Sequence, residues 1–157
     1  MAASKKKTTT KPTDAITLLK QDHEKVRGLL GSLENATGAR REKLLAQVEK
    51  ELEIHTTIEE EIFYPAYREA AKKKEDKKLY YEAVEEHHVV KVVIPDAHEG
   101  NSPEQLKAKA KVLKELVEHH ADEEEKEMFP RAKKAMDKEE LRDLGAQMEA
   151  RKTELGA

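Results

Sequence analysis

The chain contains two copies of one histidine-bearing pattern, and this internal repeat limits its fold more than any other feature. DHEKVRGLL around His23 resembles EHHVVKVVI around His87, which lies 64 residues later. HTTIEEEIFYP, which begins at His55, resembles HADEEEKEMFP, which begins at His120, 65 residues later. Each half therefore has one histidine in its first segment and His-x-x-x-Glu in its second. Two such halves imply a fold with pseudo-twofold symmetry.

Apolar residues recur at spacings of three and four through long segments of the chain, which is the period of an α-helix with one buried face. Turn-forming and capping residues separate these segments, and Pro65 predicts a kink in the second. The expected N-terminal caps are Thr13, Asp76, Ser102 and Asp137. We predict long helices over 14–34, 40–73, 76–95 and 103–135, and a shorter one after Asp137.

Short connections make sequential helices antiparallel neighbours, so we predict an all-α protein with an up-down-up-down four-helix bundle over residues 14–135. The short additional helix occupies the C-terminal segment, 136–157. Residues 1–13 are rich in lysine and threonine without periodic apolar residues, a composition typical of a disordered basic tail. A length of 157 residues fits this organisation around one main domain.

The helical period also selects which polar side chains face the interior, because neighbouring positions on a helix are about 100° apart. His87 lies on the apolar face and His88 does not, and His120 is selected over His119 in the same way. The repeat and the period agree on six residues at similar depths in the four helices. They are His23, His55, Glu59, His87, His120 and Glu124.

Four imidazoles and two carboxylates at one level of a bundle form a metal-ligand set, since residues at i and i+4 lie on one helix face. Two ions bridged by both carboxylates would each have two histidines and two oxygens, whereas a single ion would leave ligands over. Imidazole with carboxylate suits iron, manganese and zinc. The competing interpretation is a metal-free network in which histidinium ions neutralise the buried glutamates.

Composition excludes several classes of function. The chain has no cysteine, which excludes a thiolate zinc site, an iron–sulfur cluster and a cysteine nucleophile. A net charge of -3 gives no broad electrostatic attraction to nucleic acid. No apolar run approaches the roughly 20 residues that cross a bilayer, and the N-terminus lacks a hydrophobic signal segment. We therefore expect a cytoplasmic protein with neither a nucleic-acid nor a membrane partner.

The remaining histidines have less specific expected positions. We expect His88 and His119 to be partly exposed or beside the ligands, and His98 to lie in a loop. The glutamate runs are expected to face solvent, with one glutamate hydrogen-bonded to a ligand imidazole.

With these motifs the sequence resembles the hemerythrin-like family and its histidine–histidine–glutamate cation-binding motifs. The resemblance covers about Asp14 to Lys134 and rests on DHEKV, ELEIHTTIEEEIFYP, EEHHVVK and HHADEEEKEMFP. It implies a non-heme di-iron centre with an oxo or hydroxo bridge and with Glu59 and Glu124 as bridging carboxylates. It also leaves room for a tyrosine ligand, for which Tyr80 is the candidate, although a place in the buried core is the expected role of Tyr80.

The chain departs from the oxygen-carrying members of that family at two positions. A fifth histidine ligand, one turn after the third, is replaced by Lys91, and the last carboxylate is Glu124, four residues after His120, instead of an aspartate five residues after it. These differences favour open metal positions over reversible oxygen carriage.

The favoured function is therefore binding or reduction of O2, H2O2 or NO, with catalase- or peroxidase-like decomposition of peroxide preferred. The alternative is an oxygen or iron sensor, or an iron-handling protein without turnover. Both a monomer and a homodimer remain open.

Overall fold

The computed structural model describes residues 13–98 and 101–157 and contains only helices within them. The first half of the bundle comprises α1 (Ala15–Asn35), α2 (Gly38–Ile58), the π-helical turn η1 (Glu59–Phe63) and α3 (Tyr64–Ala70). The second half comprises α4 (Lys74–Ala97), α5 (Pro103–Glu123), the π-helical turn η2 (Glu124–Met128) and α6 (Phe129–Ala135). The last helix is α7 (Lys138–Glu154). Residues 1–12 of the predicted tail lie outside the described residues.

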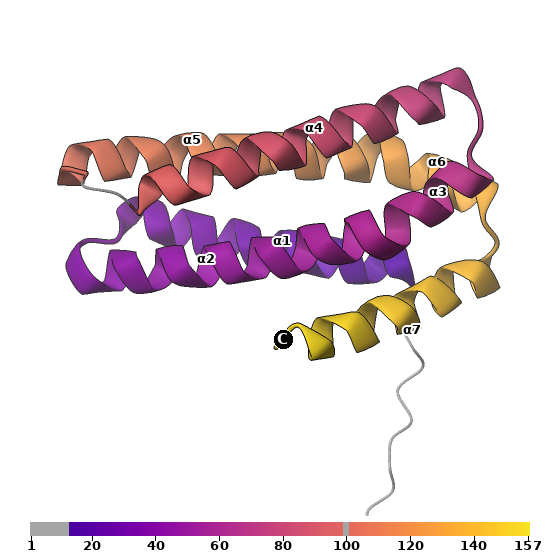
Figure 1. Ribbon diagram of the computed structural model, residues 1–157, viewed down its shortest axis with the longest axis horizontal. Helices are drawn as coiled ribbons and strands as arrows, with labels where there is room; N and C mark the ends of the chain where they lie inside the picture. The colour runs from indigo at the N-terminus through magenta and orange to yellow at the C-terminus, as the bar shows by residue number, and fades with distance from the viewer. Residues whose placement is uncertain (1–12, 99–100) are drawn as a thin grey trace, which may run out of the picture.

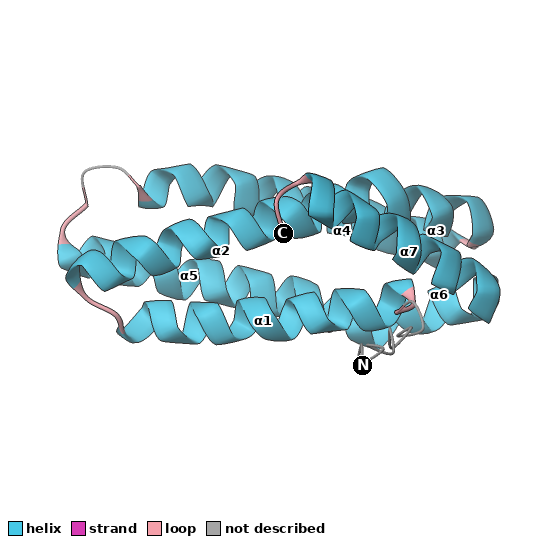
Figure 2. Cartoon of the chain, turned by 90° about the horizontal axis from the view of Figure 1, so that it is seen from below, coloured by secondary structure: helices cyan, strands magenta, loops and turns pink. Residues whose placement is uncertain are grey.

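Four long rods run side by side, because α2, η1 and α3 form one continuous helix and α5, η2 and α6 form another (Figure 1). α1 packs against α2, α5 and α7, and α4 packs against α5. Figure 2, which views the molecule from the side of α7, shows the short loop that joins α1 to α2. The predicted all-α bundle with a short C-terminal helix is therefore confirmed. No helix among the described residues is long and apolar enough to cross a membrane.

The helix ends agree with the predicted caps at Ser102 and Asp137, whose side chains accept hydrogen bonds from backbone N–H groups three residues later. The predicted cap at Thr13 is wrong, because Asp14 caps α1 by accepting from the Thr17 N–H at 2.9 Å. Asp76 lies inside α4 and accepts from the N–H of Lys73, the residue that precedes the helix, at 3.0 Å.

Two predicted ends shift by a few residues. The helix predicted to reach residue 73 ends at Ala70, and α4 continues through Pro95 to Ala97. A proline in the last turn removes only one N–H donor, and the Pro95 carbonyl still accepts from the N–H of His98 at 3.1 Å.

The predicted kink at Pro65 is preceded by a π-helical turn, and the same turn recurs in the second half. η1 begins at Glu59 and ends with the Tyr64 N–H bonded to the Glu59 carbonyl, while η2 begins at Glu124 and ends with the Phe129 N–H bonded to the Glu124 carbonyl. A proline follows each turn and cannot donate to a carbonyl four residues back. Single π-helical turns often lie at functional sites, and both turns here begin at a predicted ligand.

The apolar core consists of two clusters with the predicted ligands between them. One cluster contains Phe63, Tyr64 and Phe129 with α7 residues such as Met148. The other is aliphatic and includes Leu30, Val48 and Leu113. The helices thus bury a polar layer between two apolar regions.

Candidate metal centre

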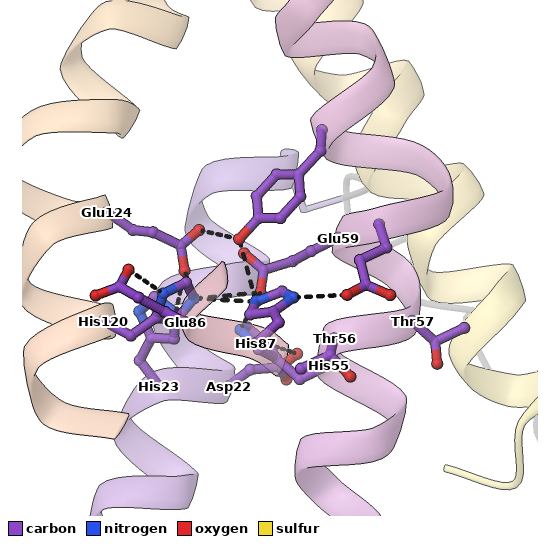
Figure 3. A network of polar contacts seen from close by, with 12 residues as sticks. Asp22, His23, His55, Thr56, Thr57, Glu59, Glu86, His87, His120 and Glu124 are labelled. Carbon is purple, nitrogen blue, oxygen red and sulfur yellow. Dashed lines mark hydrogen bonds and ion pairs between the residues drawn. The ribbon is translucent and has the colours of Figure 1, made fainter. Parts of the chain in front are cut away.

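The structure brings all six predicted ligands into one buried layer. His23 extends from α1, His55 from α2, His87 from α4 and His120 from α5, and the two glutamates are the first residues of η1 and η2. None of the six is more than 7% exposed, and Glu59 is 0% exposed. Figure 3 shows these side chains pointing toward one another from four rods of the bundle.

The six side chains divide into two groups that share both glutamates. His23 and His55 form one group with Glu59 and Glu124, and His87 and His120 form the other with the same two glutamates. Within each group, one nitrogen or oxygen from each residue lies within 4.8 Å of the others. Each group supplies two imidazoles and two carboxylates, which is the donor set expected for a pair of bridged ions.

The donor atoms fit a metal because several of them are buried without a hydrogen-bond partner. His55 Nε2 and Glu59 Oε1 are 2.9 Å apart, yet neither makes a hydrogen bond. Within the described residues, the same is true of both ring nitrogens of His23, of Glu59 Oε2 and of Glu124 Oε1. Buried polar atoms without partners cost about 1–3 kcal/mol each. A cation at the point where these lone pairs converge would satisfy them together.

Without a metal, protons on the histidines balance the carboxylates. Burial favours a neutral His55, but the Glu59 carboxylate and the hydrogen bond to Asp22 outweigh it and raise the pKa of His55 to about 10. The pKa of His120 is also raised, because attraction to Glu124 exceeds the penalty of burial. Cations and protons therefore compete for the same ring nitrogens.

Each of the four candidate histidines has a further carboxylate at its Nδ1 atom. Three of these contacts measure 3.0 Å and join His55 to Asp22, His87 to Glu60, and His120 to Glu86. The fourth, from His23 to Glu125, measures 3.7 Å. Carboxylates in this position fix the orientation of a metal-binding imidazole and increase its basicity. The expectation that a glutamate of an EEE run bonds a ligand imidazole is confirmed by Glu60.

Sequence reasoning missed Asp22 and Glu86, although the repeat carried the signal. Each of them immediately precedes the histidine of the first helix in its half, and both occupy the same repeat position. Glu60 and Glu125 likewise follow the two predicted bridging glutamates directly. The four carboxylates at the Nδ1 atoms, which we call the outer carboxylates, thus form two repeat-related pairs. They are Asp22 with Glu86, and Glu60 with Glu125.

Three of the four outer carboxylates also contact a lysine or arginine. Lys91 Nζ is 2.9 Å from Glu60, and Arg27 Nη2 is 2.7 Å from Glu125. Asp22 is paired with Lys152 of α7. Hydrogen bonds from His87 and Lys91 lower the pKa of Glu60 to about 2. Lys91, which stands where the oxygen carriers have a fifth histidine, therefore faces the outer carboxylate.

A tyrosine beside the candidate ligands makes the two halves of the site unequal. This residue is Tyr64, whereas the sequence favours Tyr80 as the candidate. The buried Tyr64 hydroxyl lies 3.1 Å from His87 Nε2 and 3.5 Å from Glu124 Oε2. Burial and the carboxylates of Glu124 and Glu59 raise the pKa of Tyr64 well above its usual value. Phe129 occupies the repeat-equivalent position and stacks on His23. Tyr80 packs edge-on against the ring of Tyr64.

A small cavity of about 20 Å³ adjoins the four histidines. The rest of its wall is mostly apolar and includes Val26, Leu52, Val90 and Val117. A space of this size holds about one water-sized molecule.

The other three histidines lie at the surface. His88 is exposed, and His98 contacts Glu49 at 2.5 Å. His119 is 72% exposed and contacts Glu86 and Glu123.

Comparisons with known proteins agree with this site. The family model of the hemerythrin HHE cation binding domain matches residues 14–152. The crystal structure of a hemerythrin HHE cation binding domain-containing protein from Mycobacterium kansasii is similar, with 30% sequence identity and a TM-score of 0.79 over 91% of this chain and 87% of that chain. No curated protein was found to match. The chain therefore belongs to the hemerythrin HHE cation-binding domain family.

Proposed function

We propose that the six converging residues hold two iron ions and that the protein decomposes hydrogen peroxide. The observation that carries this proposal is the buried Tyr64 hydroxyl, which lies within reach of both His87 and Glu124. Breaking the O–O bond of peroxide requires a proton at the departing oxygen, whereas simple binding of a diatomic gas does not. When bound, the iron pair would supply and recover the two electrons of the reaction.

The residues around the pair would have separate roles. The four histidines and two glutamates hold the ions, and the outer carboxylates fix the imidazoles. The Tyr64 hydroxyl lies beside His87 and Glu124, so it is placed to donate a proton during reduction and regain one during oxidation. One peroxide is reduced to two waters and a second is oxidised to dioxygen. Protons and electrons therefore balance without another reductant.

The small volume of the cavity beside the histidines favours a very small ligand. The space of about 20 Å³ beside the histidines is close to the size of one water molecule, so it favours the smallest ligands over organic substrates. Hydrogen peroxide, dioxygen and nitric oxide are all of this kind. The choice among them rests on the proton that Tyr64 holds.

The first test is metal content by elemental analysis of protein purified in air, with its near-ultraviolet spectrum and its rate of peroxide decomposition. We expect two irons per chain and turnover above that of free iron at equal concentration. Zinc, or a single metal, would contradict the iron pair. Two irons without turnover would instead support the alternative function, an oxygen or iron sensor or an iron-handling protein.

The second test is Tyr64→Phe, which gives the first half the side chain that the second half has at Phe129. We expect kcat for peroxide to fall by about 100-fold, the usual contribution of a positioned acid, with iron content unchanged. Tyr80→Phe is the matched control, because it removes the hydroxyl of the neighbouring ring. Equal rates for Tyr64→Phe and the unaltered protein would contradict the proton role.

A further inference from the structure

Three of the four outer carboxylates contact a lysine or an arginine among the described residues, and Glu86 is the exception. Arg27 and Lys91 are repeat-equivalent, and each pairs with an outer glutamate. Asp22 and Glu86 form the other repeat-related pair, but in the described part of the chain only Asp22 contacts a lysine, Lys152 of α7. The described surroundings of Glu86 therefore lack the fixed positive charge that its counterpart has.

Glu86 instead contacts a histidine that is shared with another carboxylate. His119 Nε2 lies 3.3 Å from Glu86 Oε2 and 3.3 Å from Glu123 Oε2. One donor atom from each of the three residues lies within 4.8 Å of the others. His119 and Glu123 have the i, i+4 spacing of the buried pairs, such as His120 with Glu124. Two helices, α4 and α5, thus present an imidazole and two carboxylates to one point in a surface groove.

The nearby lysines have other partners. In the part of the chain that the structure describes, Lys78 pairs with Glu82 at 3.7 Å and Lys126 pairs with Asp122 at 3.8 Å. Neither contacts Glu86 or Glu123. Among the described residues, the groups that can carry positive charge in contact with Glu86 are therefore the histidines His119 and His120.

The first half of the chain has apolar residues at the positions equivalent to His119 and Glu123. The repeat positions of His119 and Glu123 are occupied there by Ile54 and Ile58, which are buried. Ile58 belongs to the same apolar cluster as Met148 of α7. α7 lies on the side of α1 and α2, and Figure 1 shows no described helix over the outer side of α4 and α5. In the second half, where no described helix covers this face, residues of metal-ligand type thus stand at positions that are apolar in the first half.

We propose that Glu86, His119 and Glu123 bind a divalent cation of the zinc, manganese or ferrous type, separate from the buried pair. Three protein ligands with solvent in the remaining positions are a common arrangement for such ions. Glu86 joins this cation to the buried centre, because its other oxygen is 3.0 Å from His120 Nδ1 (Figure 3). The cation supports His120 as Lys152 supports His55, a role that rests on the proposed function of the buried site.

The test is Zn²⁺ binding to the full-length, iron-loaded protein by equilibrium dialysis, with zinc and iron measured in the same sample. We expect one Zn²⁺ in addition to the iron pair. His119→Ala should weaken its binding by at least about tenfold, the usual effect of losing a ligand or its support. Glu123→Gln should weaken it similarly, since the amide keeps the shape and loses the charge. The matched controls are His88→Ala, another exposed histidine beside a ligand, and Glu115→Gln on the same helix as Glu123.

The outcomes separate this proposal from the function of the buried site. Zinc binding that is equal in His119→Ala and the unaltered protein, or equally weakened by His88→Ala, would overturn the surface site even if two irons are present. If the protein instead holds no iron, the proposed function fails. The surface site is then supported by one zinc that disappears in His119→Ala while zinc in the buried layer remains, and overturned if no such zinc is found.

Discussion

At the scale of single residues, the two glutamates that begin the π-helical turns connect the whole centre. Glu59 is fully buried, belongs to both donor groups, and has neither side-chain oxygen hydrogen-bonded. Glu124 Oε1 is likewise buried without a hydrogen bond, while Glu124 Oε2 accepts one from the Tyr64 hydroxyl. Because both donor groups share them, a change at either glutamate should affect both groups.

We therefore predict that Glu59→Gln lowers the metal content to below about one ion per chain, since an amide is a poor substitute for a bridging carboxylate. Elemental analysis after dialysis measures the change. Glu61→Gln is the control, because Glu61 lies two residues further along η1 and pairs with Arg151 at the surface. Retention of two ions by Glu59→Gln would show that Glu59 does not bridge them.

At the scale of elements, α7 contacts the bundle closely at two places. At its middle, Gly145 lies so close to the backbone at the start of α1 that a Cβ atom there would be 2.0 Å from the Thr13 carbonyl oxygen. Near its end, Lys152 reaches Asp22 and so the Nδ1 side of His55. The helix thus covers one apolar face and also supplies a charge to the site.

We predict that Gly145→Ala destabilises the protein by about 1–3 kcal/mol, because backbone atoms leave no space for the methyl group. Gly28→Ala is the matched control on α1, where nothing lies within 4 Å of the added carbon. It should stabilise the protein by about 0.5–1 kcal/mol through helix propensity. Chemical denaturation followed by circular dichroism measures both changes, and effects of the same sign would contradict the close approach of α7 to α1.

At the scale of the whole molecule, the polar layer divides the apolar core into two clusters. Four rods contribute candidate ligands to this layer, so a pair of ions held by the two donor groups would link all four. Metal binding and folding are then coupled, since the ligands are brought together only in the folded chain.

We predict that metal raises the free energy of unfolding by about 4 kcal/mol at a free concentration about 1,000 times its Kd. For a chain of this length, this corresponds to an increase of about 10 °C in Tm. Thermal unfolding with and without a chelator measures the difference. Glu59→Gln should show little metal-dependent shift, and equal melting of the metal-bound and metal-free forms of the unaltered protein would contradict the coupling.

The helices and the six residues of the central layer were predictable from the sequence. Both follow from local periodicity, because a side chain on the apolar face of a helix has to enter the core. The same period distinguished His87 from His88 and His120 from His119, and the repeat agreed with it. The capping residues Ser102 and Asp137 were also predictable, since a cap acts within one turn of its own helix.

The division of the candidate ligands into two donor groups, and the side chains that contact the histidines, became visible only in the packed bundle. The pairing of His23 with His55, the position of Tyr64 and the contact of Lys152 with Asp22 depend on how the helices are rotated and spaced across the bundle. The π-helical turns change that rotation after Glu59 and Glu124. A pattern of spacings along one helix carries no information about distances to another, so these features emerge only when the helices pack.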